Sequence, residues 1–358
     1  MILKTYFLLA ATALCTLAAR SQPITDAQAL AAGHALETAI NTGNSFVIDH
    51  FLYPDSLLER IRQKSKMLKD AEFLKGFKSS FIPTLSKGSI SKQVLMATHN
   101  GSYRLLREYD KGGRKHLLFR MFGDGGLSYH DFILVRAGDS VKAADLYTYV
   151  SDEWVSSSVA RITDMLGQGI DPVSDVGIIK KMTEDLSDAR YMDVKSTYDS
   201  LVPGFKKNKS IMTIYIAACH HIDLGLYQAA LEEYGKTFPD AASSYLMMLD
   251  LYYLQKEYDK GLACIDKLDE IIGGDALLDY FRGNIYLAMN KKPEAITCYE
   301  HVYRYDPTMK INVLRLCAMY AATNQSDKAK KVISEYMQTP GYHIGDLNPL
   351  YDEYPDLK

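Results

Sequence analysis

The 358-residue sequence contains few of the residues and motifs that mark metal, redox or nucleotide chemistry. It has five cysteines but no CxxC pair, which is a common spacing of zinc ligands and redox-active thiols. A phosphate-binding loop, a dinucleotide-binding fingerprint, a nucleophile elbow and an HExxH zinc motif are also missing. We therefore expect no cofactor and no metal, and we expect that the protein is not an enzyme.

Positive charge and long apolar runs are scarce as well. The chain has 41 basic residues against 44 acidic residues. Nucleic-acid binding depends on neutralising phosphates with lysine and arginine, so this balance argues against a nucleic-acid partner. After the N-terminal segment, no apolar run approaches the roughly 18 residues of a membrane-spanning helix, so we expect no integral membrane segment there.

Residues 1–21 read as an export signal. Lys4 gives the segment a positive charge, and an apolar run of signal-peptide length follows it. Ala19 and Ser21 are small residues at the −3 and −1 positions of a cleavage site before Gln22. We expect this leader to be removed and the protein to be periplasmic or secreted.

Two other interpretations of the N-terminal segment stay open. Cys15 suggests attachment of a lipid, although Leu14 precedes it where a small residue is expected. The apolar run could also remain in place as an uncleaved anchor helix.

Residues 22–155 read as an α+β domain. Leu36 and Ile40 recur at helical spacing in a helix that Asp26 can cap. The period of the apolar residues then changes to that of strands, and glycine-rich turns separate these strands. We expect helices followed by an antiparallel four-stranded meander, with strands at about 93–109, 115–122, 128–136 and 141–150.

Polar residues on the third and fourth of these strands form a candidate ligand cavity. Alternation places Tyr129 and Asp131 on one face and His130 on the other, and Asp145 shares a face with Tyr147. If Asp131 and Asp145 faced a helix-covered concavity, they would form a carboxylate pair suited to acid–base work. The alternative interpretation is solvated strand residues or a structural hydrogen bond.

The order of helices followed by a curved meander resembles the cystatin-like and NTF2-like folds. In those folds the cone of the sheet holds ligands or catalytic residues. The resemblance rests on the order of elements and implies a small-ligand or weakly enzymatic site at Asp131, Asp145 and Tyr147.

Residues 156–340 read as helices and short turns with an internal repeat of 34 residues. Each copy has a small residue that lets two helices approach closely and a bulky residue one turn later that packs on the next hairpin. Three copies are in unbroken register: Tyr252, Gly261 and Ile265; Tyr286, Ala295 and Tyr299; and Tyr320, Ala329 and Ile333.

This pattern resembles the tetratricopeptide repeat (TPR). The unit 276–309 matches best, through Gly283, Tyr286, Ala295, Tyr299 and Pro307. Other units depart from the family pattern, since Leu249 and Cys317 replace the glycine and Gly261 replaces the alanine. The resemblance implies an all-α TPR-like helical solenoid over about residues 174–340, and we expect residues 341–358 to cap its end.

In this family the first helix of each hairpin lines a concave groove that binds partners. The resemblance therefore implies a groove for a protein or peptide partner. Counting by the repeat frame, the residues expected to point into it are Tyr215, Asp250, Tyr253, Tyr280, Asn284 and Arg315. The Lys/Asn/Arg clamp with which some members hold a terminal carboxylate is absent, and only Asn284 and Arg315 resemble parts of it.

The cysteines and a histidine pair invite redox or metal interpretations. Cys264 and Cys298 are equivalent in successive repeats, where packed helices lie roughly 8–10 Å apart, which is too far for a disulfide. We expect these two, with Cys219 and Cys317, to be buried free thiols. His221 occupies the place of the packing tyrosine, so a core or groove histidine is favoured over a metal ligand.

Together these observations favour an exported, TPR-type interaction or scaffold protein that binds a protein or peptide through its groove. The alternative is a small-ligand-binding or weakly enzymatic α+β domain with accessory repeats. A polar cavity on the sheet would favour the alternative, and a filled sheet face with an open groove would favour the first hypothesis.

Overall fold

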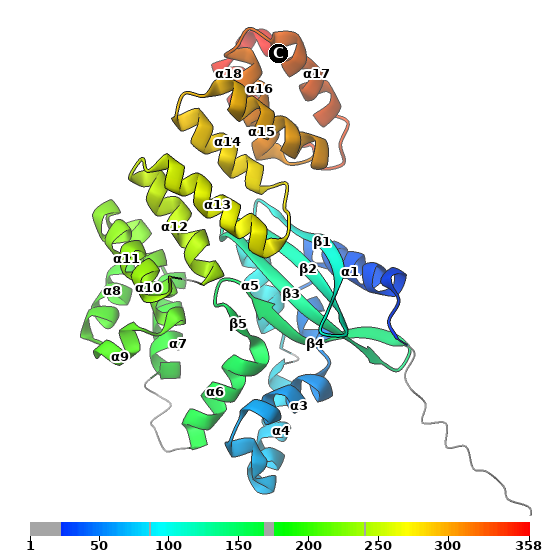
Figure 1. Ribbon diagram of the computed structural model, residues 1–358, viewed down its shortest axis with the longest axis vertical. Coiled ribbons are helices and arrows are strands. Elements are labelled where there is room, and N and C mark those ends of the chain that lie inside the picture. The colour runs from blue at the N-terminus through cyan, green and yellow to red at the C-terminus, as the bar shows by residue number, and fades with distance from the viewer. Residues whose placement is uncertain (1–22, 86, 168–174, 240) are drawn as a thin grey trace, which may run out of the picture.

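A computed structural model describes residues 23–85, 87–167, 175–239 and 241–358 (Figure 1). The expected leader 1–21, its cleavage site before Gln22 and Cys15 lie outside these residues. Within them, no helix combines the length and the apolar character that crossing a membrane requires.

Six short helices precede the sheet. They are α1 (Asp26–Asn41), α2 (Val47–Phe51), α3 (Pro54–Lys64), the 3-10 helix η1 (Met67–Lys69), α4 (Ala71–Leu85) and α5 (Ser89–Ala97). The cap of α1 is Thr25 and not Asp26 as expected. Its hydroxyl accepts from Gln28 N at 3.3 Å, and the Gln28 side chain accepts from Thr25 N at 3.2 Å, so two free donors are satisfied.

The sheet is an antiparallel meander in the order β1-β2-β3-β4-β5. Its strands are β1 (Ser102–Lys111), β2 (Arg114–Gly123), β3 (Gly126–Ala137), β4 (Ser140–Thr148) and β5 (Glu153–Trp154). The expectation of four strands missed β5, whose two residues are too short to give a periodic signal. The first strand was also expected too early, because residues 89–97 form α5.

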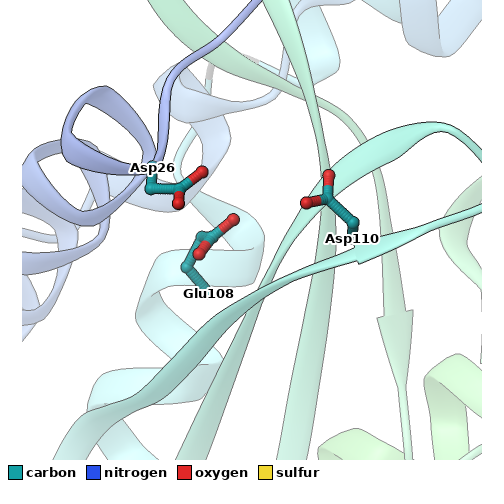
Figure 2. A group of neighbouring side chains, drawn as sticks. All are labelled: Asp26, Glu108 and Asp110. Carbon is teal, nitrogen blue, oxygen red and sulfur yellow. The ribbon is translucent and has the colours of Figure 1, made fainter.

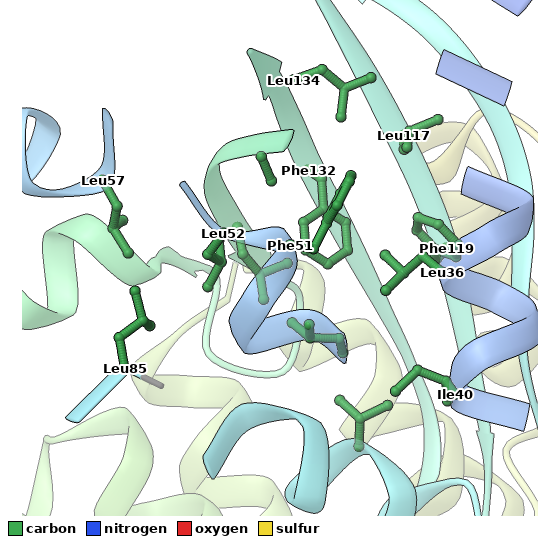
Figure 3. Close-up of a cluster of buried hydrophobic side chains, with 14 of the residues drawn as sticks. Leu36, Ile40, Phe51, Leu52, Leu57, Leu85, Leu117, Phe119, Phe132 and Leu134 are labelled. Atoms are coloured by element: carbon green, nitrogen blue, oxygen red, sulfur yellow. The ribbon is translucent and has the colours of Figure 1, made fainter. Parts of the chain in front are cut away.

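One face of the sheet packs on the N-terminal helices. Leu117 and Phe119 of β2 and Phe132 of β3 are buried against Leu36 and Phe51 (Figure 3). Alternation along β2 explains this, since every second side chain points to the same face. A cluster of this size makes the burial of apolar area the main source of stability in this part of the chain.

From residue 155 onward, every regular element that the structure describes is a helix. The elements are α6 (Val155–Gly167), α7 (Asp175–Ser187), α8 (Tyr191–Ser200), α9 (Pro203–Lys206), α10 (Lys209–Ile222), α11 (Leu224–Thr237), α12 (Ala242–Leu254), α13 (Tyr258–Ile272), α14 (Leu278–Ala288), α15 (Lys292–Tyr305), α16 (Lys310–Ala321), α17 (Ser326–Tyr336), α18 (Asn348–Glu353) and the 3-10 helix η2 (Pro355–Leu357).

These helices pack as hairpins. The strongest pairings are α10 with α11, α12 with α13, α14 with α15, and α16 with α17. In the third hairpin, a Cβ added to Gly283 would lie 2.6 Å from the ring of Tyr299, so only glycine allows this approach. Leu347 and Leu350, near α18, are buried against the last hairpin. The C-terminal half is therefore a stack of helical hairpins, as the 34-residue repeat predicts.

The second face of the sheet packs on this stack (Figure 1). Leu118 of β2 and Tyr129 of β3 are buried with Ile265 and Leu268 of α13. The side chain of Asp275, in the loop between α13 and α14, is buried as well and accepts from the Tyr129 hydroxyl at 3.0 Å. The sheet is thus covered on one face by the N-terminal helices and on the other by repeat helices.

Polar contacts join the sheet to three inter-repeat segments. Arg107 donates to the carbonyls of Ile272 and Gly273, which are the free acceptors at the C-terminal end of α13. Asp152 accepts from Ser243 N at 3.2 Å and so caps α12 from outside the stack. Further along, Arg104 lies 3.2 Å from the Asp306 carboxylate in the loop between α15 and α16. The sheet therefore bridges several repeats.

Candidate functional site

A cavity of about 350 Å³ opens on the first helices of three successive hairpins, α12, α14 and α16. We call it the groove. It contains four of the six residues expected there, namely Asp250, Tyr253, Asn284 and Arg315. Its remaining lining is apolar and consists of Leu249, Phe281, Ile285, Leu287 and Ala288.

The 34-residue spacing explains why these side chains meet. Asp250 and Asn284 are 34 residues apart, and so are Phe281 and Arg315. Residues at equivalent places in stacked repeats point in the same direction, so each pair lies on one face of the stack. Phe281 was missed by the sequence interpretation, although its distance from Arg315 carries the signal that identifies it.

Tyr215 and Tyr280 do not line the groove, which corrects the expectation for both. Tyr280 directly precedes Phe281, and one residue on a helix is a rotation of about 100°, which turns its ring into the core. It is buried, with its ring centroid 6.0 Å from that of Tyr299. Tyr215 is likewise buried, stacked on Tyr198 with ring centroids 3.8 Å apart.

A carboxylate lies at the α12 side of the groove. Asp250 reaches solvent on one side, yet neighbouring helices crowd it enough that burial raises its pKa. The hydroxyl of Tyr227 donates to Asp250 Oδ2 at 3.0 Å, which opposes part of that shift by stabilising the charged form. A carboxylate held this way favours the approach of a donor or a cation.

A cation lies at the opposite side of the groove. Arg315 is exposed on α16, and among the described residues no carboxylate lies within ion-pair distance of its guanidinium. Between the two charges, Asn284 accepts from the Tyr299 hydroxyl at 2.8 Å through Oδ1. This bond orients the amide and leaves its NH2 group as the available donor. The groove therefore has an acidic side, an amide and a basic side above an apolar floor.

The expected carboxylate pair on the sheet is not assembled as a reactive site. Asp131 is buried and accepts from the Tyr109 hydroxyl at 2.7 Å, with His116 Nδ1 at 2.9 Å. Asp145 is buried as well and has different partners, Arg60 Nε at 2.8 Å and the Ser156 hydroxyl at 2.5 Å. Each carboxylate is thus satisfied by protein groups, as the structural alternative predicts.

Tyr147, the third residue of that predicted cavity, is half-buried. Its ring packs on Tyr149 and Trp154, with centroids 5.1 and 5.3 Å away. Burial raises the pKa of its hydroxyl to about 12. The residue therefore acts as part of the packed edge of the sheet.

Three carboxylates converge at the start of α1 and the end of β1. They belong to Asp26, Glu108 and Asp110 (Figure 2). The ammonium group of Lys115 lies 2.6, 2.5 and 2.6 Å from them, respectively. Hydrogen bonds from Lys115 to Asp110, Asp26 and Glu108 raise the pKa of the lysine, so it stays charged. A lysine therefore supplies the positive charge that these carboxylates attract.

The cysteines and histidines behave partly as expected. Cys219, Cys264 and Cys317 are buried free thiols, whereas Cys298 is free but only half-buried, which corrects the expectation of full burial. His220 and His221 are exposed, and His221 stacks on Tyr191 with ring centroids 4.3 Å apart. His221 therefore lies in the exposed last turn of α10, outside both the core and the groove, which corrects the expectation.

Comparison with known proteins gives little further information. No family model matches the chain, and no curated protein matches it. Two solved structures of MamA AMB-1 are similar to part of the chain, both with a TM-score of 0.37. One is 13% identical and covers 46% of this chain and 97% of its own, and the other is 14% identical and covers 50% and 99%. A TM-score this low does not establish a shared fold, so the description of the C-terminal half as stacked hairpins rests on its own helices.

Proposed function

We propose that the protein binds an extended segment of a partner protein or peptide in the groove and does not act as an enzyme. The observation that carries this proposal is the gathering of Asp250, Tyr253, Asn284 and Arg315 over an apolar floor. Exposed tyrosine and arginine above apolar side chains are the composition of interface anchors. Tyr253 is 46% exposed, so its ring is available to a partner.

A random peptide library displayed on phage and panned against the full chain tests this proposal. Selected peptides should lose affinity by about tenfold or more when Tyr253→Ala removes the exposed ring. Tyr305→Ala is a matched control, because Tyr305 is similarly exposed at 43% but lies outside the groove lining. Equal binding to wild type and to Tyr253→Ala would count against the groove as the binding site.

We also propose that the chain is exported to the periplasm or secreted. Support comes from Lys4, the apolar run after it, and the small residues Ala19 and Ser21. Expression of the full chain in a secreting host should release a protein whose first residue is Gln22. N-terminal sequencing of the released and cell-bound forms checks this, and recovery of an intact N-terminus would contradict it.

A further inference from the structure

The groove carries opposite charges at its two sides, and neither is neutralised by an ion pair within the described chain. Asp250 accepts only the hydroxyl of Tyr227 among the hydrogen bonds of this region, and Arg315 faces the groove from α16. A charge on His220 also acts on Asp250 and lowers the pKa of its carboxyl, after burial, which raises it, and the Tyr227 hydrogen bond, which lowers it. Unpaired charges of opposite sign, facing one cavity, select a ligand with the complementary order of charges.

The distance between the two charges sets the length of such a ligand. Asp250 lies on the first helix of one hairpin, and Arg315 lies on the first helix of the second hairpin after it. With a helix spacing of roughly 8–10 Å per hairpin step, the axes of α12 and α16 are about 16–20 Å apart, and this is the largest separation that the ligand has to span. An extended chain covers this distance with about five or six residues.

The floor between the charges is apolar and held in place from below. Phe281 packs edge-on against Phe122 of β2, with ring centroids 6.2 Å apart. Ile285 is buried in the cluster that joins the sheet to α13. A floor fixed by the sheet loses little entropy when a side chain settles on it, which favours binding.

We infer that the groove selects an extended peptide with a basic group at Asp250, a carboxylate at Arg315, and an apolar side chain between them over Phe281. This inference rests on the proposed peptide-binding function and specifies the chemistry of its ligand. The two charged groups of the peptide are separated by about five or six residues. Either chain direction satisfies the requirement, because the order of charges across the groove decides recognition.

Three end-blocked synthetic peptides with the same central phenylalanine test the inference on the full chain. One has lysine and glutamate at about six residues' separation, and the others have two lysines or two glutamates there. The mixed peptide should bind wild type at least about tenfold more tightly than either uniform peptide, and added salt should reduce the difference. Equal affinities for the three peptides would overturn the inference.

Charge-reversal variants supply a second, independent readout. Asp250→Lys should shift the preference to the peptide with two glutamates, and Arg315→Glu should shift it to the peptide with two lysines. Asp250→Asn is the matched control, since it keeps an acceptor for Tyr227 and removes only the charge. Far-ultraviolet circular dichroism and melting curves verify that each variant is folded. Variants that keep the wild-type preference would overturn the inference.

The two proposals fail in different ways. If library-selected peptides depend on Tyr253 but the three designed peptides bind equally, the groove binds peptides and the charge inference is wrong. If neither the selected nor the designed peptides respond to any groove variant, the proposed function itself is wrong.

Discussion

Arg120 and Asp275 form an ion pair across the boundary between the sheet and the helical stack, with Nη1 and Oδ1 2.7 Å apart. Both side chains are buried, at 2% and 0% exposure. The hydroxyl of Tyr129 donates to the second carboxylate oxygen at 3.0 Å. The carboxylate also accepts from Leu277 N at 3.0 Å, so it orders the turn that starts α14, a helix of the groove.

Removing one partner of this pair should be costly. Asp275→Ala leaves the buried guanidinium without its counter-charge, which we expect to lower the free energy of unfolding by about 3–5 kcal/mol. Urea denaturation measures the change. Lys267→Ala, which breaks the exposed Lys267–Glu270 pair, is the control and should cost well under about 1 kcal/mol. The double variant Arg120→Met/Asp275→Leu should recover much of the stability lost in Asp275→Ala. Equal losses of stability in Asp275→Ala and Lys267→Ala would contradict this account.

His130 should make the protein sensitive to mild acid. Its ring is buried beside the Tyr103 hydroxyl, 3.0 Å from Nδ1, and burial lowers its pKa to about 4. In an unfolded chain the value is about 6.5, so the unfolded state binds the proton first as pH falls. This residue should therefore remove about 2 kcal/mol of stability between pH 7 and pH 5.

The measurement for His130 is urea unfolding at both pH values for wild type and for His130→Gln. The variant has no imidazole to protonate, so its stability should fall less over the same interval. Identical pH dependence in the two proteins would show that another group causes the loss.

Gly283 should not tolerate a methyl group. A Cβ there would lie 2.6 Å from the ring of Tyr299, which is fully buried and cannot move aside freely. We expect Gly283→Ala to lower the melting temperature through a loss of about 1–3 kcal/mol. Gly76→Ala in α4, where no atom lies within 4 Å of an added Cβ, should be neutral or slightly stabilising. A stabilised Gly283→Ala would refute the tight packing of α14 on α15.

Asp152 should stabilise the stack although it lies before the first repeat helix. It caps α12 through Ser243 N and pairs with Lys209 at 3.0 Å. Asp152→Ala should cost about 1–2 kcal/mol, because the first turn of α12 loses its acceptor. Asp152→Asn should cost less, since asparagine retains an acceptor and tolerates the positive φ of 49° at this position. Thermal melts of the two variants at one pH test whether Asp152→Ala is less stable than Asp152→Asn.

The four cysteines of the repeats should stay reduced and react slowly. Burial raises the pKa of Cys264 and Cys298 to about 11 and that of Cys317 to about 12. Few thiolates therefore exist at neutral pH, and the thiolate is the reactive form. A thiol reagent should label half-buried Cys298 first and the others only in denaturant. Rapid labelling of Cys317 in the native protein would contradict the structure.

The repeat could be read from the sequence because its signal is periodic. A spacing of 34 residues places Asp250 and Asn284 on one face without knowledge of any contact. The same frame failed by one residue at Tyr280, since a single position on a helix decides between core and groove. Periodicity predicts the direction of a side chain only in copies whose register is known. The copy that contains Tyr215 is displaced by a shorter loop, so its side chains could not be assigned by the 34-residue spacing.

The N-terminal part was harder to predict, for two physical reasons. Residues 94–97 form a short apolar run, which is equally compatible with a strand and with a buried helix end, and the structure places them at the end of α5. The contact between sheet and stack had no local signal either. Arg120 and Asp275 are 155 residues apart in the sequence, and no local sequence pattern around either residue identifies the other as its partner.

The sheet limits how far the stacked repeats can bend or separate. In a solenoid whose repeats touch only their neighbours, bending and fraying proceed one unit at a time. Here Asp152, Asp275 and Arg104 tie the sheet to segments of three different hairpins. Stretching or local opening of the stack must therefore break contacts with the sheet as well, so the curvature of the groove is set from outside the repeats.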